Sequence, residues 1–273
     1  SVHCTAYVSK RNNMSEKKSV NYKNWVPKGM VCACAAITTF ALLCSAAILR
    51  FIGLKNAATW AVFVLLLAVF VFFGAAFAWR FAAYNAFSYT GKRQLSRRII
   101  EKIASYVVLP EGGTGLDVGC GSGALTIAYA KKNPGAFMVG IDRWGKEYAS
   151  FSKALCEANA EAEGAPNASF AKGDAVKLDF ESEHFDAVTS NYVYHNIPSS
   201  DRRQLLAETL RVLKKGGRFA IHDLMSAARY GDMEAFVEDL KKQGYEKVEL
   251  IDTANGLFMQ PIEAKLFLLS GSK

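Results

Sequence analysis

Two long stretches without a charged side chain constrain the fold of this 273-residue chain more than any other feature. The first runs from Gly29 to Leu49 and the second from Ala57 to Trp79. Each has about 20 residues, which as a helix reaches across a hydrocarbon core of ~30 Å. Apolar side chains cover the whole circumference of the second stretch, so it has no polar face to turn toward water. We predict a two-helix transmembrane hairpin over residues 29–79.

Two other interpretations of these stretches stay open at this point. The first stretch is also a candidate signal peptide, although its apolar part exceeds the ~7–15 residues that are typical and a second stretch follows at once. Both stretches are also candidates for buried core helices of a soluble domain. The lack of a polar stripe disfavours that interpretation.

The net charge of +8 is distributed unevenly along the chain. Residues 1–98 hold 13 Lys and Arg against one acid, whereas residues 99–273 hold 20 Lys and Arg against 24 acids. Positive residues beside membrane spans stay in the cytoplasm, and the short connection between the stretches carries only Arg50 and Lys55. We therefore predict a multi-pass protein of the cell membrane with both termini in the cytoplasm. No nucleic-acid partner is expected, because the folded part is mildly acidic.

The segments on either side of the hairpin differ in their patterns. Residues 1–28 are polar, basic and without periodicity, and we expect a disordered tail. Within residues 80–110, a linker, the stretch 82–108 carries apolar side chains at three- and four-residue spacing, which predicts an amphipathic helix. The six cysteines have no zinc-site spacing, so no metal site is expected.

Strands and helices alternate over residues 111–273. The expected strands are 115–118, 137–141, 169–172, 185–190, 218–222, 247–252 and 264–270. The expected helices are 123–132, 145–163, 199–214 and 231–243. This alternation predicts an α/β fold with a doubly wound, mostly parallel sheet of seven strands.

A glycine-rich turn follows the first of these strands, in the run Leu116 to Gly123. Glycines at 119, 121 and 123 allow a tight turn and a close approach to a ligand that a Cβ would push away. The helix after the turn presents N–H groups to that ligand. The run also satisfies a dinucleotide fingerprint, which alone is a weak signal. The turn predicts a nucleotide-like cofactor.

Three carboxylates bear on the choice of cofactor. Asp117 lies two residues before the first glycine, where it would repel a pyrophosphate and attract the ammonium group of a sulfonium cofactor. Asp142 ends the second strand, where a carboxylate can accept both hydroxyls of an adenosine ribose. Asp174 follows the third strand, where a carboxylate can accept from an adenine amino group. Together they favour S-adenosylmethionine over NAD(P).

With these residues the sequence resembles the class I S-adenosylmethionine-dependent methyltransferases, in their small-molecule branch. The similar motifs are Leu116–Gly123, Gly140–Asp142, Lys172–Asp174, Phe185–Asn191 and Leu210–Phe219. The resemblance implies a Rossmann-like sheet with a C-terminal antiparallel hairpin, a bound S-adenosylmethionine, and a lid formed by the linker. The cofactor-binding residues expected on these grounds are Asp117, Gly119, Cys120, Gly121, Gly123, Asp142, Arg143, Trp144, Asp174, Ala175 and Asn191.

The acceptor of the methyl group is less constrained. Nucleic-acid and amide methyltransferases of this superfamily often carry an Asn/Asp-Pro-Pro-aromatic motif after strand four, and here the prolines are missing from Asn191 to Tyr194. His195, just past that strand, is the candidate general base. The pair His222-Asp223 at the end of strand five is expected either to orient substrate or to cap the next turn.

The hairpin points to a small, lipid-soluble acceptor reached from the bilayer. Alternatives are a protein or RNA acceptor, a non-catalytic cofactor-binding membrane protein and, least favoured, an NAD(P)-dependent oxidoreductase.

Overall fold

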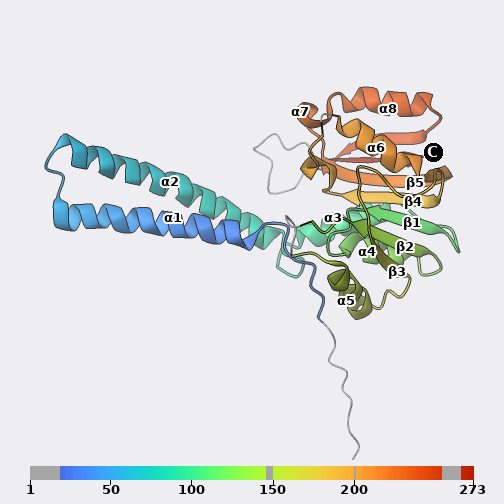
Figure 1. Cartoon of the computed structure of the whole chain (residues 1–273), viewed down its shortest axis with the longest axis horizontal. Helices are drawn as coiled ribbons and strands as arrows, with labels where there is room; N and C mark the ends of the chain where they lie inside the picture. Colours follow the sequence, from blue (N-terminus) through green and yellow to red (C-terminus); the bar gives the residue numbers. More distant parts are fainter. Residues whose placement is uncertain (1–18, 146–149, 200, 254–265) are drawn as a thin grey trace, which may run out of the picture.

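A long helical hairpin projects from an α/β domain (Figure 1). The computed structural model describes residues 19–145, 150–199, 201–253 and 266–273. Most of the tail predicted at residues 1–28, namely residues 1–18, lies outside the described residues.

The hairpin is built from two antiparallel helices. Helix α1 (Lys28–Ala47) continues through a π-helical turn, η1 (Ile48–Ile52), and α2 (Ala57–Ala86) returns to the domain. Asn56 starts α2 with a capping box, in which its side chain accepts from the Thr59 N–H and the Thr59 hydroxyl accepts from the Asn56 N–H. Both helices are long and apolar enough to cross a membrane. This extends the hairpin predicted at 29–79 by about two turns into the linker.

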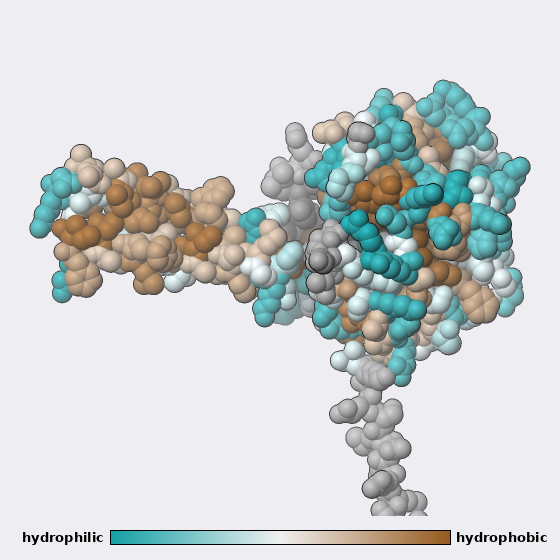
Figure 2. Space-filling model, in the orientation of Figure 1, coloured by the Kyte–Doolittle hydropathy of each residue, from teal (hydrophilic) through white to brown (hydrophobic). Residues whose placement is uncertain are grey.

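The two helices bury one narrow face and expose the rest. The buried residues of α1 recur at spacings near one and two turns, and they are Val31, Cys34, Ala41 and Ser45. Gly74 of α2 lies against the Thr38 side chain, where an added Cβ would be 3.6 Å from its methyl group. None of the most apolar 18-residue window of α2 is buried, and Figure 2 shows the hairpin surface as almost continuously hydrophobic. A helix of the core of a soluble domain would not show this exposure.

The linker differs from the single helix predicted over 82–108. Helix α2 runs on to Ala86, and a separate helix α3 spans Leu95–Ser105. The connection between them ends with Gln94 in the left-handed region at φ 48°, a conformation that cannot continue a right-handed helix. The hydroxyl of Ser96 donates to the Phe87 carbonyl across this bend. The apolar periodicity therefore predicted helical structure correctly on both sides of residues 87–94. It did not indicate the break between the two helices.

The seven-stranded sheet has the order β3-β2-β1-β4-β5-β7-β6. The strands are β1 (Thr114–Val118), β2 (Phe137–Asp142), β3 (Ala168–Lys172), β4 (Phe185–Asn191), β5 (Leu213–Leu224), β6 (Glu246–Asp252) and β7 (Leu266–Ser272). The first five pair in parallel, and β7 inserts antiparallel between β5 and β6. The predicted mostly parallel, doubly wound sheet with a C-terminal antiparallel hairpin is confirmed.

Helices cover both faces of this sheet (Figure 1). The helices that follow α3 are α4 (Ala124–Lys132), α5 (Lys153–Glu163), the 3-10 turn η3 (Tyr194–Asn196), α6 (Arg202–Arg211), α7 (Ala227–Tyr230) and α8 (Met233–Lys242). One core cluster joins the sheet to α3, α4 and α5, and a second joins it to α6, α7 and α8. Helices thus cover both faces of the sheet, and the carboxyl ends of the parallel strands stay accessible to a ligand.

Two predicted helix boundaries were wrong for local reasons. Within the described residues, the helix expected at 145–163 is α5, which begins at Lys153 because the Ser152 hydroxyl accepts from the Leu155 N–H and caps it there. Residues 146–149 of that prediction lie outside the described residues. The helix expected to run to residue 214 ends at Arg211 because the chain enters β5 at Leu213, opposite Phe185 of β4.

Candidate functional site

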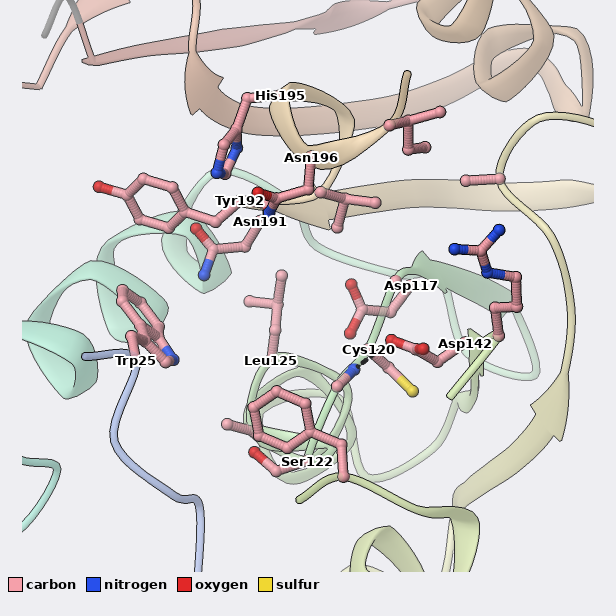
Figure 3. Close-up of a pocket in the computed structure, with 18 of the residues that line it drawn as sticks. Trp25, Asp117, Cys120, Ser122, Leu125, Asp142, Asn191, Tyr192, His195 and Asn196 are labelled. Atoms are coloured by element: carbon pink, nitrogen blue, oxygen red, sulfur yellow. Dashed lines mark hydrogen bonds between the residues drawn. The ribbon is translucent and has the colours of Figure 1, made fainter. Parts of the chain in front are cut away.

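A cavity of about 870 Å³ opens at the carboxyl ends of the parallel strands (Figure 3). Its volume lies in the upper part of the ~300–1,000 Å³ that small-molecule sites cover. One half of its lining is polar and comes from the ends of β1 and β2, from the residues after β3 and from the glycine turn. The other half is largely apolar and comes from the end of β4, from α3 and from residues before and after the hairpin.

The glycine turn forms the floor of the polar half. The N–H groups of Gly119 and Cys120 both donate to the Ile141 carbonyl, which fixes the turn against β2. Gly119, Gly121 and Gly123 all have positive φ. At Gly121 an added Cβ would meet nothing closer than 4.0 Å, so the turn leaves open space above it. Helix α4 then begins directly at Ala124, with its N-terminal N–H groups at the cavity.

The carboxylates predicted from the sequence converge on this half. Asp142 accepts from the Gly121 N–H at 2.9 Å and from the Trp144 N–H at 2.7 Å. Asp174 accepts from the Val176 N–H at 2.9 Å in a tight turn. Both side chains line the cavity. Backbone N–H groups therefore hold these two carboxylates in place, and each keeps lone pairs that can accept from a ligand.

Asp117 is buried more deeply than the other two, with 1% of its surface exposed. It accepts from the Thr126 hydroxyl at 2.7 Å and the Thr189 hydroxyl at 3.1 Å. Burial raises the pKa of Asp117 to about 7, against the opposing effect of the two hydroxyl groups. Near neutral pH this carboxyl group is thus poised between its two protonation states, and a nearby cation would favour the charged one.

Not every predicted cofactor residue reaches the cavity. Cys120, Arg143, Ala175 and Asn191 line it, whereas Gly123 and Trp144 do not. Trp144 has φ 44°, and its indole Nε1 donates to the Gly121 carbonyl at 3.0 Å, so this side chain supports the glycine turn from behind. A contact between Trp144 and the cofactor stays a prediction. Burial raises the pKa of the Cys120 thiol, which keeps it protonated and unreactive.

His195 is oriented by a buried acid on the neighbouring strand. Its Nδ1 lies 2.5 Å from Asp223 Oδ1, and its backbone N–H donates to Asp223 Oδ2 at 3.2 Å. Burial alone would raise the pKa of Asp223, but the hydrogen bonds from His195 and from the Leu224 N–H outweigh it and lower that pKa. An ionised Asp223 holds the proton of the imidazole on Nδ1 and leaves Nε2 as a free acceptor. Asp223 thus orients His195, a role that differs from the two expected for His222-Asp223, and orientation of substrate by this pair stays a prediction.

His222 itself has a structural position. It is 1% exposed, its Nδ1 lies 2.9 Å from Asn191 Oδ1, and its Nε2 lies 2.8 Å from the Thr253 hydroxyl. Burial lowers the pKa of His222 to about 4, so this ring is neutral at pH 7. The neutral ring donates from Nδ1 to the Asn191 oxygen, and the Asn191 amide is left with its NH₂ group for other partners.

Residues before the hairpin complete the cavity, which sequence analysis did not anticipate. We call residues 21–27 the strap. Trp25 lies 5.2 Å from the Tyr192 ring and 5.7 Å from the Phe87 ring, centroid to centroid, and all three side chains line the cavity. Figure 3 shows Trp25 across the cavity from His195. The disordered tail predicted for residues 1–28 is thus wrong for the strap, which long-range hydrogen bonds hold in place.

A family of known proteins matches the part of the chain that runs from β1 into β5. Residues 116–221 match the family described as a methyltransferase domain. A 27-O-demethylrifamycin SV methyltransferase of Amycolatopsis mediterranei is 26% identical over 158 residues, which are 58% of this chain and 56% of that protein. A demethylmenaquinone methyltransferase of Lactobacillus johnsonii is 35% identical over 111 residues, 40% of this chain and 43% of that protein. The chain thus spans about half the length of these relatives.

A solved structure shares the fold. The cyclase SpnF is similar with a TM-score of 0.51 and 20% identity over 66% of this chain and 82% of that one. The sheet, the glycine turn and the matched region together define an S-adenosylmethionine-dependent methyltransferase domain. The chain carries this domain behind two apolar helices. The likeness to a cyclase shows the fold alone, since one fold supports several chemistries.

Proposed function

We propose that this protein is a membrane-anchored methyltransferase that transfers a methyl group from S-adenosylmethionine to a small, hydrophobic acceptor dissolved in the bilayer. The observation that carries the proposal is the continuity of the cavity with the hairpin. Trp25, Val26 and Pro27 line the cavity, and α1 begins at the next residue. The same few residues thus belong to the site and to the membrane anchor.

The dimensions of the hairpin support insertion in a bilayer. On α2, Trp60 and Trp79 are both exposed and stand nineteen residues apart, which is about 28 Å along a helix. This spacing fits a ~30 Å hydrocarbon core with a tryptophan at each interface. Lys28 and Arg80 lie at the domain end of the hairpin, and Arg50 and Lys55 lie at its tip. In this arrangement only a few residues of the chain separate the cavity from the headgroup layer.

The charges around the hairpin support a cytoplasmic domain. Residues 80–98 carry Arg80, Lys92, Arg93, Arg97 and Arg98 and no acid, whereas the tip carries two basic residues. The excess of basic residues marks the cytoplasmic side. This supports a cytoplasmic position for the methyltransferase domain and, with it, for the C-terminus.

The polar half of the cavity fits S-adenosylmethionine. In this proposal Asp117 and the turn at Gly119 and Gly121 bind the methionine moiety, Asp142 accepts from the ribose hydroxyls, and Asp174 accepts from the adenine amino group. Asn191 offers its amide NH₂, and Cys120, Arg143 and Ala175 complete the walls. When bound, the cofactor supplies a methyl group on a positively charged sulfur. The protein contributes mainly proximity and alignment of a nucleophile with that methyl group.

The apolar half fits the acceptor. Trp25, Phe87 and Tyr192 provide ring faces, and Tyr192 is held at φ 58° by a hydrogen bond from its N–H to the His222 carbonyl. His195 stands at the edge of this half with Nε2 free to take a proton from an attacking acceptor atom. The names of the two relatives describe methylation of demethylmenaquinone and 27-O-demethylrifamycin SV, which supports a small-molecule acceptor.

The protonation of Asp117 predicts how cofactor binding depends on pH. The ammonium group of S-adenosylmethionine favours ionised Asp117, whereas burial in the free protein raises its pKa to about 7. Binding below that pH must release a proton. We expect the association constant to rise by up to about tenfold per pH unit from pH 5 to 7 and then to level off. Calorimetry at several pH values, in buffers of different ionisation heat, measures both the slope and the proton release.

Asp117→Asn provides the matched control, because an amide of the same shape does not titrate. The variant should bind more weakly at pH 7.5 and show no such slope. An equal slope in the variant, or a flat profile in the wild type, would contradict the role of Asp117. NADH in the same titration cell should give no binding heat.

The test of the proposed function is the transfer of a labelled methyl group from S-adenosylmethionine to the lipid fraction of a membrane extract by the full chain in nanodiscs. Label in that fraction is the expected result.

A further inference from the structure

We propose that the strap is one wall of the acceptor site and that Trp25 is the residue that determines which membrane-dissolved molecule is accepted. The occupant inferred for the apolar half is an apolar molecule with a planar ring that enters from the bilayer. This inference rests on the proposed function. It adds a specificity-determining residue from outside the matched methyltransferase region of residues 116–221.

The strap is fixed to the cofactor turn by its own hydrogen bonds. The Asn21 N–H donates to Asn159 Oδ1 at 2.8 Å, and Asn159 Nδ2 donates back to the Asn21 carbonyl at 3.1 Å. The same Nδ2 lies 3.0 Å from the Ser122 carbonyl, and the Ser122 hydroxyl donates to the Tyr22 carbonyl at 2.9 Å. The strap therefore has a defined position relative to the glycine turn.

Two further contacts set the strap against the end of the hairpin. Tyr22 is 5% exposed, and its ring centroid lies 4.4 Å from that of Tyr89. Asn24 Nδ2 donates to the Tyr84 carbonyl at 2.7 Å, and its Oδ1 accepts from the Val26 N–H at 2.9 Å. The strap is thus held between α2 and the glycine turn, and the ring of Trp25 is presented to the cavity.

The position of Trp25 fits recognition of a ring. Its indole meets Tyr192 edge-on, with an interplanar angle of 63°, and Tyr192 in turn lies 5.9 Å from the His195 ring. A planar acceptor that contacts Trp25 and Tyr192 would therefore be close to the candidate base. Aromatic walls hold flat apolar molecules through offset or edge-to-face contacts.

The route to this wall leads from the bilayer. Trp25 is three residues before Lys28, the first residue of α1, and α1 presents exposed apolar side chains such as Met30 and Ile37 along its length. A molecule dissolved among the lipid chains can follow this surface to Pro27 and Trp25 without crossing the cytoplasm. The position of this wall beside α1 therefore favours an acceptor dissolved in the bilayer over a water-soluble one.

The first experiment compares variants of the full chain in phosphatidylcholine nanodiscs that are loaded with the neutral-lipid fraction of bacterial membranes. We expect Trp25→Ala to lower transfer of labelled methyl to that fraction at least tenfold, with the dissociation constant of S-adenosylmethionine unchanged within twofold. Trp25→Phe should retain most of the transfer. The matched control is Trp79→Ala, because Trp79 is exposed on α2 and does not line the cavity.

The second experiment does not depend on turnover. Trp25 is replaced by the photoreactive p-benzoylphenylalanine, Trp79 is replaced likewise in a separate control, and both proteins are irradiated in the loaded nanodiscs before mass spectrometry. We expect an adduct with a ring-containing neutral lipid at position 25 and adducts with phosphatidylcholine at position 79. Phosphatidylcholine alone at position 25, or full transfer by Trp25→Ala, would overturn the inference. Failure of the wild type to bind S-adenosylmethionine in calorimetry would instead overturn the proposed function.

Discussion

Replacement of Gly119 by alanine is expected to abolish measurable binding of S-adenosylmethionine. Gly119 has φ 74°, and an added Cβ would lie 2.7 Å from Val193 Cγ1 and closer still to Cγ2. Left-handed backbone costs an L-residue roughly 1–2 kcal/mol, and the overlap forces either the turn or Val193 to move. Both line the cavity. We therefore expect the dissociation constant to rise more than 100-fold, measured by calorimetry with the folded state checked by thermal unfolding.

Gly112→Ala separates the two effects of that substitution. Gly112 has φ 72° but nothing within 4 Å of an added Cβ, so this variant has the backbone strain without the overlap and should bind the cofactor normally. The double variant Gly119→Ala with Val193→Ala removes the overlapping methyl groups and should recover part of the affinity. Normal binding by Gly119→Ala alone would show that the turn does not hold the cofactor.

Replacement of His195 by alanine is expected to lower kcat by about 10²–10⁴, the usual contribution of a positioned general base. Affinity for S-adenosylmethionine should stay within twofold, because His195 lies on the acceptor side of the cavity. Asp223→Asn should reproduce much of the loss, since an amide can replace the hydrogen bond to Nδ1 but cannot stabilise the imidazolium charge. Single-turnover rates of methyl transfer measure both.

The control for these variants is His184→Ala, a histidine exposed to solvent near Phe180 and absent from the cavity lining. It should transfer methyl groups at the wild-type rate. An unchanged rate in His195→Ala would remove this residue as the base. A loss of cofactor affinity equal to the loss of rate would assign His195 to the cofactor instead.

The features predicted correctly from the sequence depend on local patterns. The two uncharged stretches were predicted from their length and apolar composition, and the structure has a helix in each of them. The glycine turn follows β1 as expected, since three glycines with positive φ can close so tight a corner. The alternation of strands and helices also leaves few arrangements other than a doubly wound sheet.

The features that sequence analysis missed depend on contacts between distant residues. The strap has the composition of a disordered tail, and its order comes from Asn159 and Ser122, 138 and 100 residues away from their partners. The pairing of His195 with Asp223 requires that β4 lie beside β5 in the register that sets Asn191 opposite His222. Periodicity within a segment carries no information about such contacts.

The proposed function requires that the full chain methylates a molecule of the bilayer. The most direct measurement is mass spectrometry of a membrane extract incubated with the full chain in nanodiscs and S-adenosylmethionine that carries a deuterated methyl group. We predict a deuterated product in the neutral-lipid fraction that is absent when Gly119→Ala replaces the wild type. Deuterium found only in water-soluble compounds, protein or RNA would contradict the account.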